Sequence, residues 1–351
     1  MTLVTSVALY GCGDDGTGFE PSSESTALCA LAESLTATAG FPDGIPALTE
    51  PALVSADAAG HMLDEDRVLG VVVDGEARAY PHNILWSHEI VNDRFGDRWV
   101  TVSFCPLTGS GLAIDATVQG RRVDFGVSGL LFANNLVLYD RESEGLFGPQ
   151  LSVDARCDAF AGATPELLPV QEMSWIRWKE LHPHTRVVSD ATGYDRNYRR
   201  YPYGEYDQIG NDDLLFPMET DRTRPMKERV LGVRVGPTGG VAFPFGELER
   251  MGPRAALNRQ IASADVTVFY EMAGGGTAVA YNARLEGSRL TFETTDTGWR
   301  DTETGTTWDL SGRAVEGPLA PARLEPMAEA YVAFWFAWRH FQPDAEVWSA
   351  N

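Results

Sequence analysis

The amino-acid sequence repeats itself, and this repetition limits the possible folds more than any other feature. The tetrapeptide RVLG at residues 67–70 recurs at residues 229–232, and further blocks recur in the same order. These blocks are residues 79–81 and 242–244, 100–102 and 266–268, 120–125 and 287–292, 140–147 and 301–308, and 175–178 and 335–338. Ordered blocks at a nearly constant offset of about 160 residues indicate that residues 61–190 and 226–351 are two copies of one unit.

Each copy is expected to consist mainly of β-strands. Residues 71–73 and 77–80 flank the turn Asp74-Gly75, which predicts a β-hairpin. Further elements are expected from hydrophobic periodicity as strands at 99–104, 111–117, 122–127 and 136–139, and as helices at 82–93 and 175–181. Because the strands come in hairpins rather than alternating with helices, we predict an α+β fold. In it, two tandem copies of a mainly antiparallel, β-rich unit pack together.

The N-terminal residues are typical of an exported lipoprotein. A short apolar stretch ends in Gly11 and Cys12, as in a bacterial lipoprotein processing box, so Cys12 is the expected lipidation site. The expected organisation is a signal segment (1–12), a flexible tether (13–40), a first repeat unit with its entry segment (41–190), an inter-repeat segment (191–225) and a second, degenerate repeat unit (226–351). We therefore expect a cell-envelope protein that faces the periplasm, and the alternative is a cytosolic chain with an irregular N-terminus.

The net charge argues against a nucleic-acid partner, and the hydropathy argues against a membrane-spanning helix. The chain has 28 Lys and Arg against 50 Asp and Glu, a net charge of −22 that opposes binding to nucleic acid. No stretch approaches the roughly 18 apolar residues of a membrane-spanning helix, so the lipid anchor is the expected membrane attachment. The expected ligand is a small molecule or a metal ion.

Cys29 and Cys157 could form a disulfide, although spacing does not fix the connectivity.

Several short motifs carry a family resemblance. They are DGIPAL at 43–48, ARAYP at 77–81, HEIVND at 88–93, CPLTGS at 105–110, GVSG at 126–129, NNL at 134–136 and FWFAW at 334–338. These motifs resemble a bacterial family known as domain of unknown function 3179, and the resemblance extends from about residue 41 to residue 348. It implies an uncharacterised bacterial protein and no particular activity. Ser87 and Phe147 stand where tryptophan is common in the family.

The reactive side chains lie in the first copy only. His82, His88, Glu89 and Cys105 align with Phe245, Met251, Gly252 and Glu271 of the second copy. Residues shared by both copies are expected to hold the fold, so we expect one site in the first copy at the turn that begins with Cys105. Three polar residues, Ser128, Asn134 and Asn135, are expected at its rim, where they could contact a cofactor.

Three functions are compatible with this site. The first is binding of copper or zinc by Cys105, His82 and His88, with or without metal-dependent catalysis, because thiolate and imidazole select these ions. The second is a thiol-dependent enzyme in which Cys105 is the nucleophile, a histidine is the base and Glu89 orients that base. The third is a non-catalytic ligand-binding or scaffolding lipoprotein with a buried thiol. A thiol beside an imidazole and solvent would favour the first two, and an enclosed thiol would favour the third.

Overall fold

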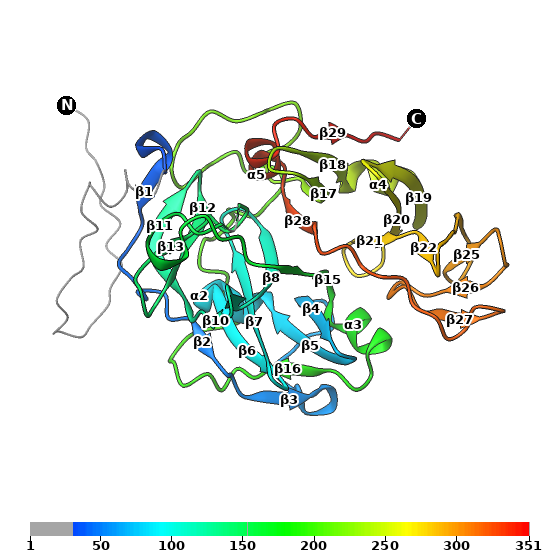
Figure 1. Cartoon of the computed structure of the whole chain (residues 1–351), viewed down its shortest axis with the longest axis horizontal. Coiled ribbons are helices and arrows are strands. Elements are labelled where there is room, and N and C mark those ends of the chain that lie inside the picture. Colours follow the sequence, from blue (N-terminus) through cyan, green and yellow to red (C-terminus); the bar gives the residue numbers. More distant parts are fainter. Residues whose placement is uncertain (1–30, 153, 351) are drawn as a thin grey trace.

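The protein is rich in β-strands, which form several mainly antiparallel sheets (Figure 1). The computed structural model describes residues 31–152 and 154–350. Cys12 and Cys29 lie outside these residues. Within the described ranges, no helix has the length and apolar character needed to span a membrane. The prediction of a β-rich, mainly antiparallel fold is confirmed, and we call residues 31–190 the first half and residues 226–350 the second half.

A hairpin forms the centre of one sheet in the first half, whose strand order is β15-β4-β5-β16-β3. The two hairpin strands pair antiparallel, and Asp74 and Gly75 between them both have positive φ, as a tight hairpin turn requires. The strand β16 pairs parallel to β5. The bounds are β3 (Leu53–Ser55), β4 (Arg67–Val73), β5 (Glu76–Pro81), β15 (Gln171–Ser174) and β16 (Arg186–Val188). The predicted hairpin is therefore confirmed.

Two further sheets complete the first half, with the orders β14-β8-β7-β6-β2 and β1-β11-β12-β13. Their strands are β1 (Thr36–Thr38), β2 (Leu48–Thr49), β6 (Ile90–Phe95), β7 (Arg98–Cys105), β8 (Ser110–Asp115), β11 (Phe125–Phe132), β12 (Asn135–Asp140), β13 (Leu146–Phe147) and β14 (Leu167–Leu168). A ribbon of β9 (Thr117–Val118) and β10 (Arg121–Arg122) lies between β8 and β11. The strands predicted at 99–104 and 136–139 are confirmed, whereas the one predicted at 122–127 is divided between β10 and β11.

The second half contains a sheet with the order β28-β17-β18-β29, in which β29 pairs parallel to β18. Its other sheets have the orders β19-β20-β21, β22-β23 and β24-β25-β26-β27. The bounds are β17 (Arg229–Val235), β18 (Gly239–Pro244), β19 (Arg254–Ile261), β20 (Ala264–Glu271), β21 (Thr277–Asn282), β22 (Arg284–Leu285), β23 (Ser288–Arg289), β24 (Phe292–Thr294), β25 (Trp299–Asp301), β26 (Thr307–Trp308), β27 (Ala314–Glu316), β28 (Ala330–Phe334) and β29 (Glu346–Val347). In Figure 1 the two halves lie side by side, and β15 contacts β21.

The α-helices are short. They are α2 (His82–His88), α3 (Trp175–Leu181), α4 (Phe245–Arg250) and α5 (Trp335–Phe341). The prediction of a helix over 175–181 is confirmed, but the helix predicted over 82–93 ends at His88. Its end follows from the backbone of Glu89, whose φ of 56° cannot continue a right-handed helix, and β6 begins at the next residue. A helix over 82–93 would place Glu89 on the same face as His82, and the early end of α2 removes that arrangement.

Each half packs a tryptophan from a helix onto a glycine of a strand. Trp178 of α3 lies over Gly70 of β4, and Trp338 of α5 lies over Gly232 of β17. A β-carbon added to Gly70 would stand 2.1 Å from the Trp178 ring, and one added to Gly232 would stand 1.9 Å from the Trp338 ring. No other residue type would allow the helix to approach the sheet this closely.

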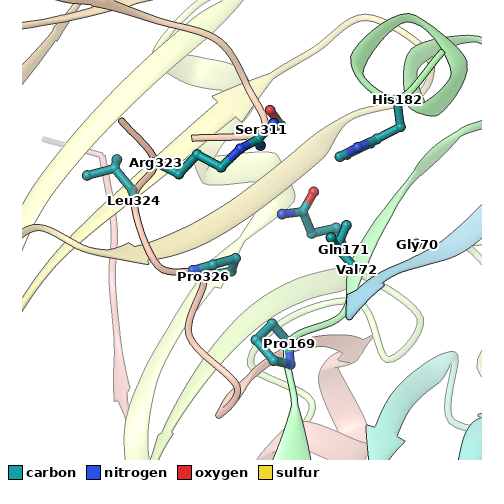
Figure 2. A pocket seen from close by; sticks show the side chains of 9 residues that line it. All are labelled: Gly70, Val72, Pro169, Gln171, His182, Ser311, Arg323, Leu324 and Pro326. Carbon is teal, nitrogen blue, oxygen red and sulfur yellow. The ribbon is translucent and has the colours of Figure 1, made fainter. Parts of the chain in front are cut away.

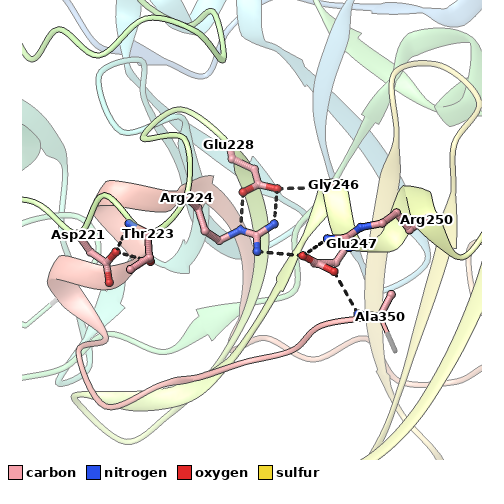
Figure 3. A network of polar contacts seen from close by, with 8 residues as sticks. All are labelled: Asp221, Thr223, Arg224, Glu228, Gly246, Glu247, Arg250 and Ala350. Atoms are coloured by element: carbon pink, nitrogen blue, oxygen red, sulfur yellow. Dashed lines mark hydrogen bonds and ion pairs between the residues drawn. The ribbon is translucent and has the colours of Figure 1, made fainter.

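The segment 191–225 crosses from one half to the other without a helix or strand of its own. The hydroxyl of Tyr206 donates to the carbonyl of Leu107 in the first half at 3.0 Å. At the other end, Arg224 donates to Glu247 in the second half at 3.0 Å, within a network of polar contacts (Figure 3). The segment is thus attached by its side chains to both halves.

Candidate functional site

Cys105 lies at the end of β7, and its thiol is enclosed. The side chain is 1% exposed, and its Sγ donates a weak hydrogen bond to the carbonyl of Asn134 at 3.6 Å. Burial and the nearby carboxyl of Glu89 raise the pKa of the Cys105 thiol to about 11. The thiol is therefore protonated at neutral pH, and a protonated thiol is a poor nucleophile and a poor metal ligand.

The structure does not bring His82 to Cys105. Side chains alternate along a strand, so Phe104 and Cys105 point to opposite faces of β7, and they belong to different hydrophobic clusters. The His82 ring packs on Phe104, with ring centroids 4.2 Å apart, and so lies on the face away from the thiol. Burial lowers the pKa of His82 to about 4, and its Nε2 has no hydrogen-bond partner among the described residues.

His88 is occupied by hydrogen bonds within the protein. Its Nδ1 donates to the carbonyl of Pro46 at 2.7 Å, and its Nε2 accepts from the hydroxyl of Tyr198 at 2.6 Å. Burial lowers the pKa of His88, which keeps the ring neutral. Across residues 31–152 and 154–350, no three His, Cys, Asp or Glu side chains are grouped so that they could hold one metal ion. Cys105, His82 and His88 are thus not brought together.

Glu89 is the one predicted catalytic residue that lies near the thiol. Its carboxyl is buried, and burial raises its pKa to about 8, so it is mainly uncharged at neutral pH. The carboxyl interacts electrostatically with Cys105 and with Tyr203 of the inter-repeat segment. The Tyr201 hydroxyl of the same segment donates to the carbonyl of Pro106 at 3.3 Å. The segment therefore covers an uncharged acid and an uncharged thiol.

The polar residues around the CPLTGS turn bond to one another. Asn135 Nδ2 donates to Thr108 Oγ1 at 2.9 Å and to Gln150 Oε1 at 3.1 Å. Ser110 Oγ also donates to Gln150 Oε1, at 2.7 Å. These side chains are fully buried, so this network fixes the turn and offers nothing to a ligand. Sequence reasoning had not identified Gln150, because its partners are distant in the sequence.

The other two predicted rim residues, Asn134 and Ser128, also form hydrogen bonds within the protein. Asn134 donates to the carbonyl of Phe216 at 2.8 Å and accepts from the amide of the same residue at 2.9 Å. Ser128 Oγ donates to the carbonyl of Val137 at 2.5 Å. Asn134 contacts the thiol through its carbonyl, whereas the hydrogen bonds of Ser128 go to the backbone of β11 and β12. These residues hold the backbone around Cys105 and the inter-repeat segment in place.

A cavity of about 150 Å³ lies between the two halves, at a place that sequence reasoning had not singled out (Figure 2). It is lined by Gly70, Val72, Pro169, Gln171 and His182 of the first half and by Ser311, Arg323, Leu324 and Pro326 of the second half. In Figure 2 the side chains of Gln171, His182 and Arg323 point toward a common space. The cavity thus has polar groups from both halves.

Three polar groups of this cavity lack partners among the described residues, whereas Gln171 Nε2 donates to the Tyr281 hydroxyl at 3.4 Å and Ser311 Oγ donates to Asp309. Gln171 Oε1 and His182 Nε2 are buried and form no hydrogen bond with any described residue. Burial and the positive charge of Arg323 lower the pKa of His182 to about 4, so the ring is neutral. Arg323 is exposed at the edge of the cavity, and within the described part of the chain its guanidinium forms neither an ion pair nor a hydrogen bond. The cavity, and not the Cys105 turn, therefore presents unsatisfied polar groups.

Comparison with known proteins identifies a family. A family model described as a protein of unknown function, DUF3179, matches residues 42–345, which is nearly the whole chain. No curated protein and no solved structure matches the chain.

Proposed function

Because the chain belongs to the DUF3179 family, whose function is unknown, we propose from its geometry that it is a non-catalytic ligand-binding protein of the cell envelope. Its binding site is the cavity between the two halves. The observation that carries this proposal is the pair of buried atoms Gln171 Oε1 and His182 Nε2, which line the cavity without partners. Each unpaired buried polar group costs roughly 1–3 kcal/mol, and a polar ligand in the cavity would remove that cost.

Two observations support export to the envelope. The apolar stretch, Gly11-Cys12 and polar tether occur in the order of a lipoprotein signal, with Cys12 as the lipidated residue. Cys157 is disulfide-bonded, which suits the oxidising side of a bacterial membrane. In this proposal the protein faces the periplasm and is held to the membrane by its lipid.

The proposal includes a tandem duplication. The order β28-β17-β18-β29 matches β15-β4-β5-β16, and both contain the contact between a glycine and a tryptophan. Asn92 exchanges hydrogen bonds of 2.8 and 3.2 Å with the backbone of Phe125, and Asn258 does the same with Phe292 at 2.8 and 2.9 Å. Matching strand order and matching hydrogen bonds at similar offsets support two copies of one unit, with the cavity at their seam.

The enclosed thiol favours this function over chemistry at Cys105. Binding of copper or zinc by Cys105, His82 and His88 would require His88 to release Pro46 and Tyr198, and His82 to leave the opposite face of β7. These movements would disrupt buried contacts, which costs free energy.

One observation favours a second candidate function, thiol-dependent catalysis. Glu89 combines a buried carboxyl, a φ of 56° and an electrostatic interaction with Cys105. Left-handed backbone at residues other than glycine clusters at functional sites. Catalysis there would require segment 191–225 to move away from the thiol.

Ligand binding at the seam can be tested with Gln171→Tyr, which places a large ring in the cavity. We expect ligand-observed NMR to detect binding of small polar compounds such as 2-hydroxybutyrate, its amide and butyrate to the wild-type protein and not to this variant. The same substitution at the exposed Gln208, Gln208→Tyr, is the matched control and should bind as the wild type does. Absence of binding to the wild type, or equal binding by Gln171→Tyr, would contradict the proposal.

A further inference from the structure

We infer that the cavity between the two halves takes a small organic anion that carries one carboxylate and one hydroxyl group. The inference rests on the proposed function and adds the chemical class of the ligand. It follows from the charge of the cavity edge, the hydrogen-bonding capacity of its buried groups and its size.

The edge of the cavity is locally positive. Arg323 has no carboxylate partner among the residues that the structure describes, and His182 is neutral. Asp309, the acidic group that acts electrostatically on His182, already accepts from Ser311 Oγ at 2.6 Å and from Arg313 Nε at 3.3 Å. Two guanidinium groups, of Arg313 and Arg323, and one occupied carboxylate therefore act on His182. In a chain with a net charge of −22, this local excess of positive charge selects an anion for the cavity.

The buried groups determine which atoms the ligand needs. Arg323 can only donate hydrogen bonds, and a neutral His182 with its proton on Nε2 also donates, so both fit the oxygens of a carboxylate. Gln171 Oε1 can only accept, and it requires a hydroxyl or an amine on the ligand. An ammonium group would find no free carboxylate in the lining described above, so a hydroxyl fits better.

The size and walls of the cavity limit the rest of the ligand. Val72, Pro169, Leu324 and Pro326 supply apolar surface. A volume of about 150 Å³ is that of a cavity that holds a benzene-sized molecule. A short aliphatic or single-ring hydroxycarboxylate therefore fits, whereas a nucleotide or an oligosaccharide is too large. Apolar walls also favour such a compound over inorganic phosphate, which would leave them uncovered.

Isothermal titration calorimetry of the full chain with three related compounds tests this inference. We expect 2-hydroxybutyrate to bind about tenfold more tightly than its amide, which lacks the charge, because hydrogen bonds to charged groups are stronger than those to neutral groups. We expect a loss of about fivefold for butyrate, which lacks the hydroxyl and its neutral hydrogen bond.

Two variants assign these differences to side chains. Arg323→Gln, at an exposed position, should abolish the preference for the carboxylate over the amide. Gln171→Leu should abolish the preference for 2-hydroxybutyrate over butyrate, and circular dichroism establishes that the variant is folded. If the amide binds wild type as tightly as the acid, or if Arg323→Gln retains the preference, the inference on ligand class is overturned while ligand binding at the seam stands. If inorganic phosphate displaces 2-hydroxybutyrate at equal concentration, the organic class is likewise overturned. If none of the compounds binds wild type, both this inference and the proposed function fail.

Discussion

The two halves differ at matching positions of β15 and β28. Gln171 pairs with Gly70 in the first half, and Tyr331 pairs with Gly232 in the second half. Tyr331 is 1% exposed and packs against Trp338, with ring centroids 5.4 Å apart. Gln171 has no aromatic ring, and the cavity lies beside it. If the halves are copies of one unit, as proposed above, a position that carries a buried ring in the second half carries a glutamine beside the proposed binding cavity in the first half.

A second difference concerns Cys105 and its counterpart Glu271. Glu271 is buried and forms ion pairs of 2.7 Å with Arg177 and 2.9 Å with Arg254. Arg177 belongs to α3 of the first half, so Glu271 links the two halves. Both positions therefore serve packing, one with an enclosed thiol and the other with a paired carboxylate. A reactive residue type that occurs in one half only is not sufficient to identify a site.

The largest expected effect comes from breaking what the two halves share. Gly70→Ala and Gly232→Ala should each lower the free energy of unfolding by about 3 kcal/mol, because the new methyl group collides with a tryptophan ring. Urea denaturation of both variants measures this loss. The double variant with Trp178→Phe and Gly70→Ala should recover part of the lost stability. If only one of the two glycine variants is destabilised, the contact between glycine and tryptophan does not have the same role in both halves.

A smaller effect is expected at Glu89, whose counterpart Gly252 carries no charge. The pKa of Glu89 is raised to about 8 in the folded protein from 4.5, so the folded state retains a proton that the unfolded state releases. Stability attributable to this group is present at low pH and is lost as pH rises from about 4.5 to about 8. At about 1.4 kcal/mol per pH unit, the wild type should lose about 2 kcal/mol between pH 5 and pH 7 relative to Glu89→Gln.

Denaturation at several pH values would measure this difference, and Glu325→Gln provides the matched substitution at an exposed position. Parallel pH profiles for the wild type and Glu89→Gln would show that the carboxyl is not protonated in the folded state. Burial of an uncharged carboxyl would then not distinguish Glu89 from Gly252. The feature that remains for comparison is the backbone, which has a positive φ at both residues.

The smallest effect is expected for Cys105→Ser. The hydroxyl can donate to the Asn134 carbonyl as the thiol does, so we expect a stability loss of about 1 kcal/mol and no change in metal content. Elemental analysis of the purified protein, after exposure to copper or zinc, measures the metal bound by both forms. A stoichiometric metal ion in the wild type that Cys105→Ser loses would restore the metal hypothesis for Cys105.

Local signals predicted much of the secondary structure. The hairpin at Asp74-Gly75 and the helix α3 were predictable because turn residues, hydrophobic spacing and a following proline act over a few residues. The end of α2 was not, because it depends on a left-handed backbone at Glu89, a residue type that rarely adopts it.

The sequence was less informative about the candidate sites. The orientation of His82 relative to Cys105 depends on which face of β7 the helix α2 covers, and that is decided by packing between distant residues. The cavity could not be predicted from local sequence patterns, because Gln171 and Arg323 come together only when the two halves are packed against each other. No hydrophobic periodicity or sequence motif predicts contacts between residues that are this far apart in the sequence.

The position of the cavity also affects the order of assembly. Most strand pairs join neighbouring elements, but a distant strand completes the hairpin sheet of each half, β15 on β4 and β28 on β17. Pairing of strands that are far apart in the sequence is slow, so each half closes late. The walls around Gln171 and Arg323 exist only after the halves have docked, because residues of both halves form them. A ligand held there would bind the completed molecule and neither half alone, so it would stabilise the docked state by mass action.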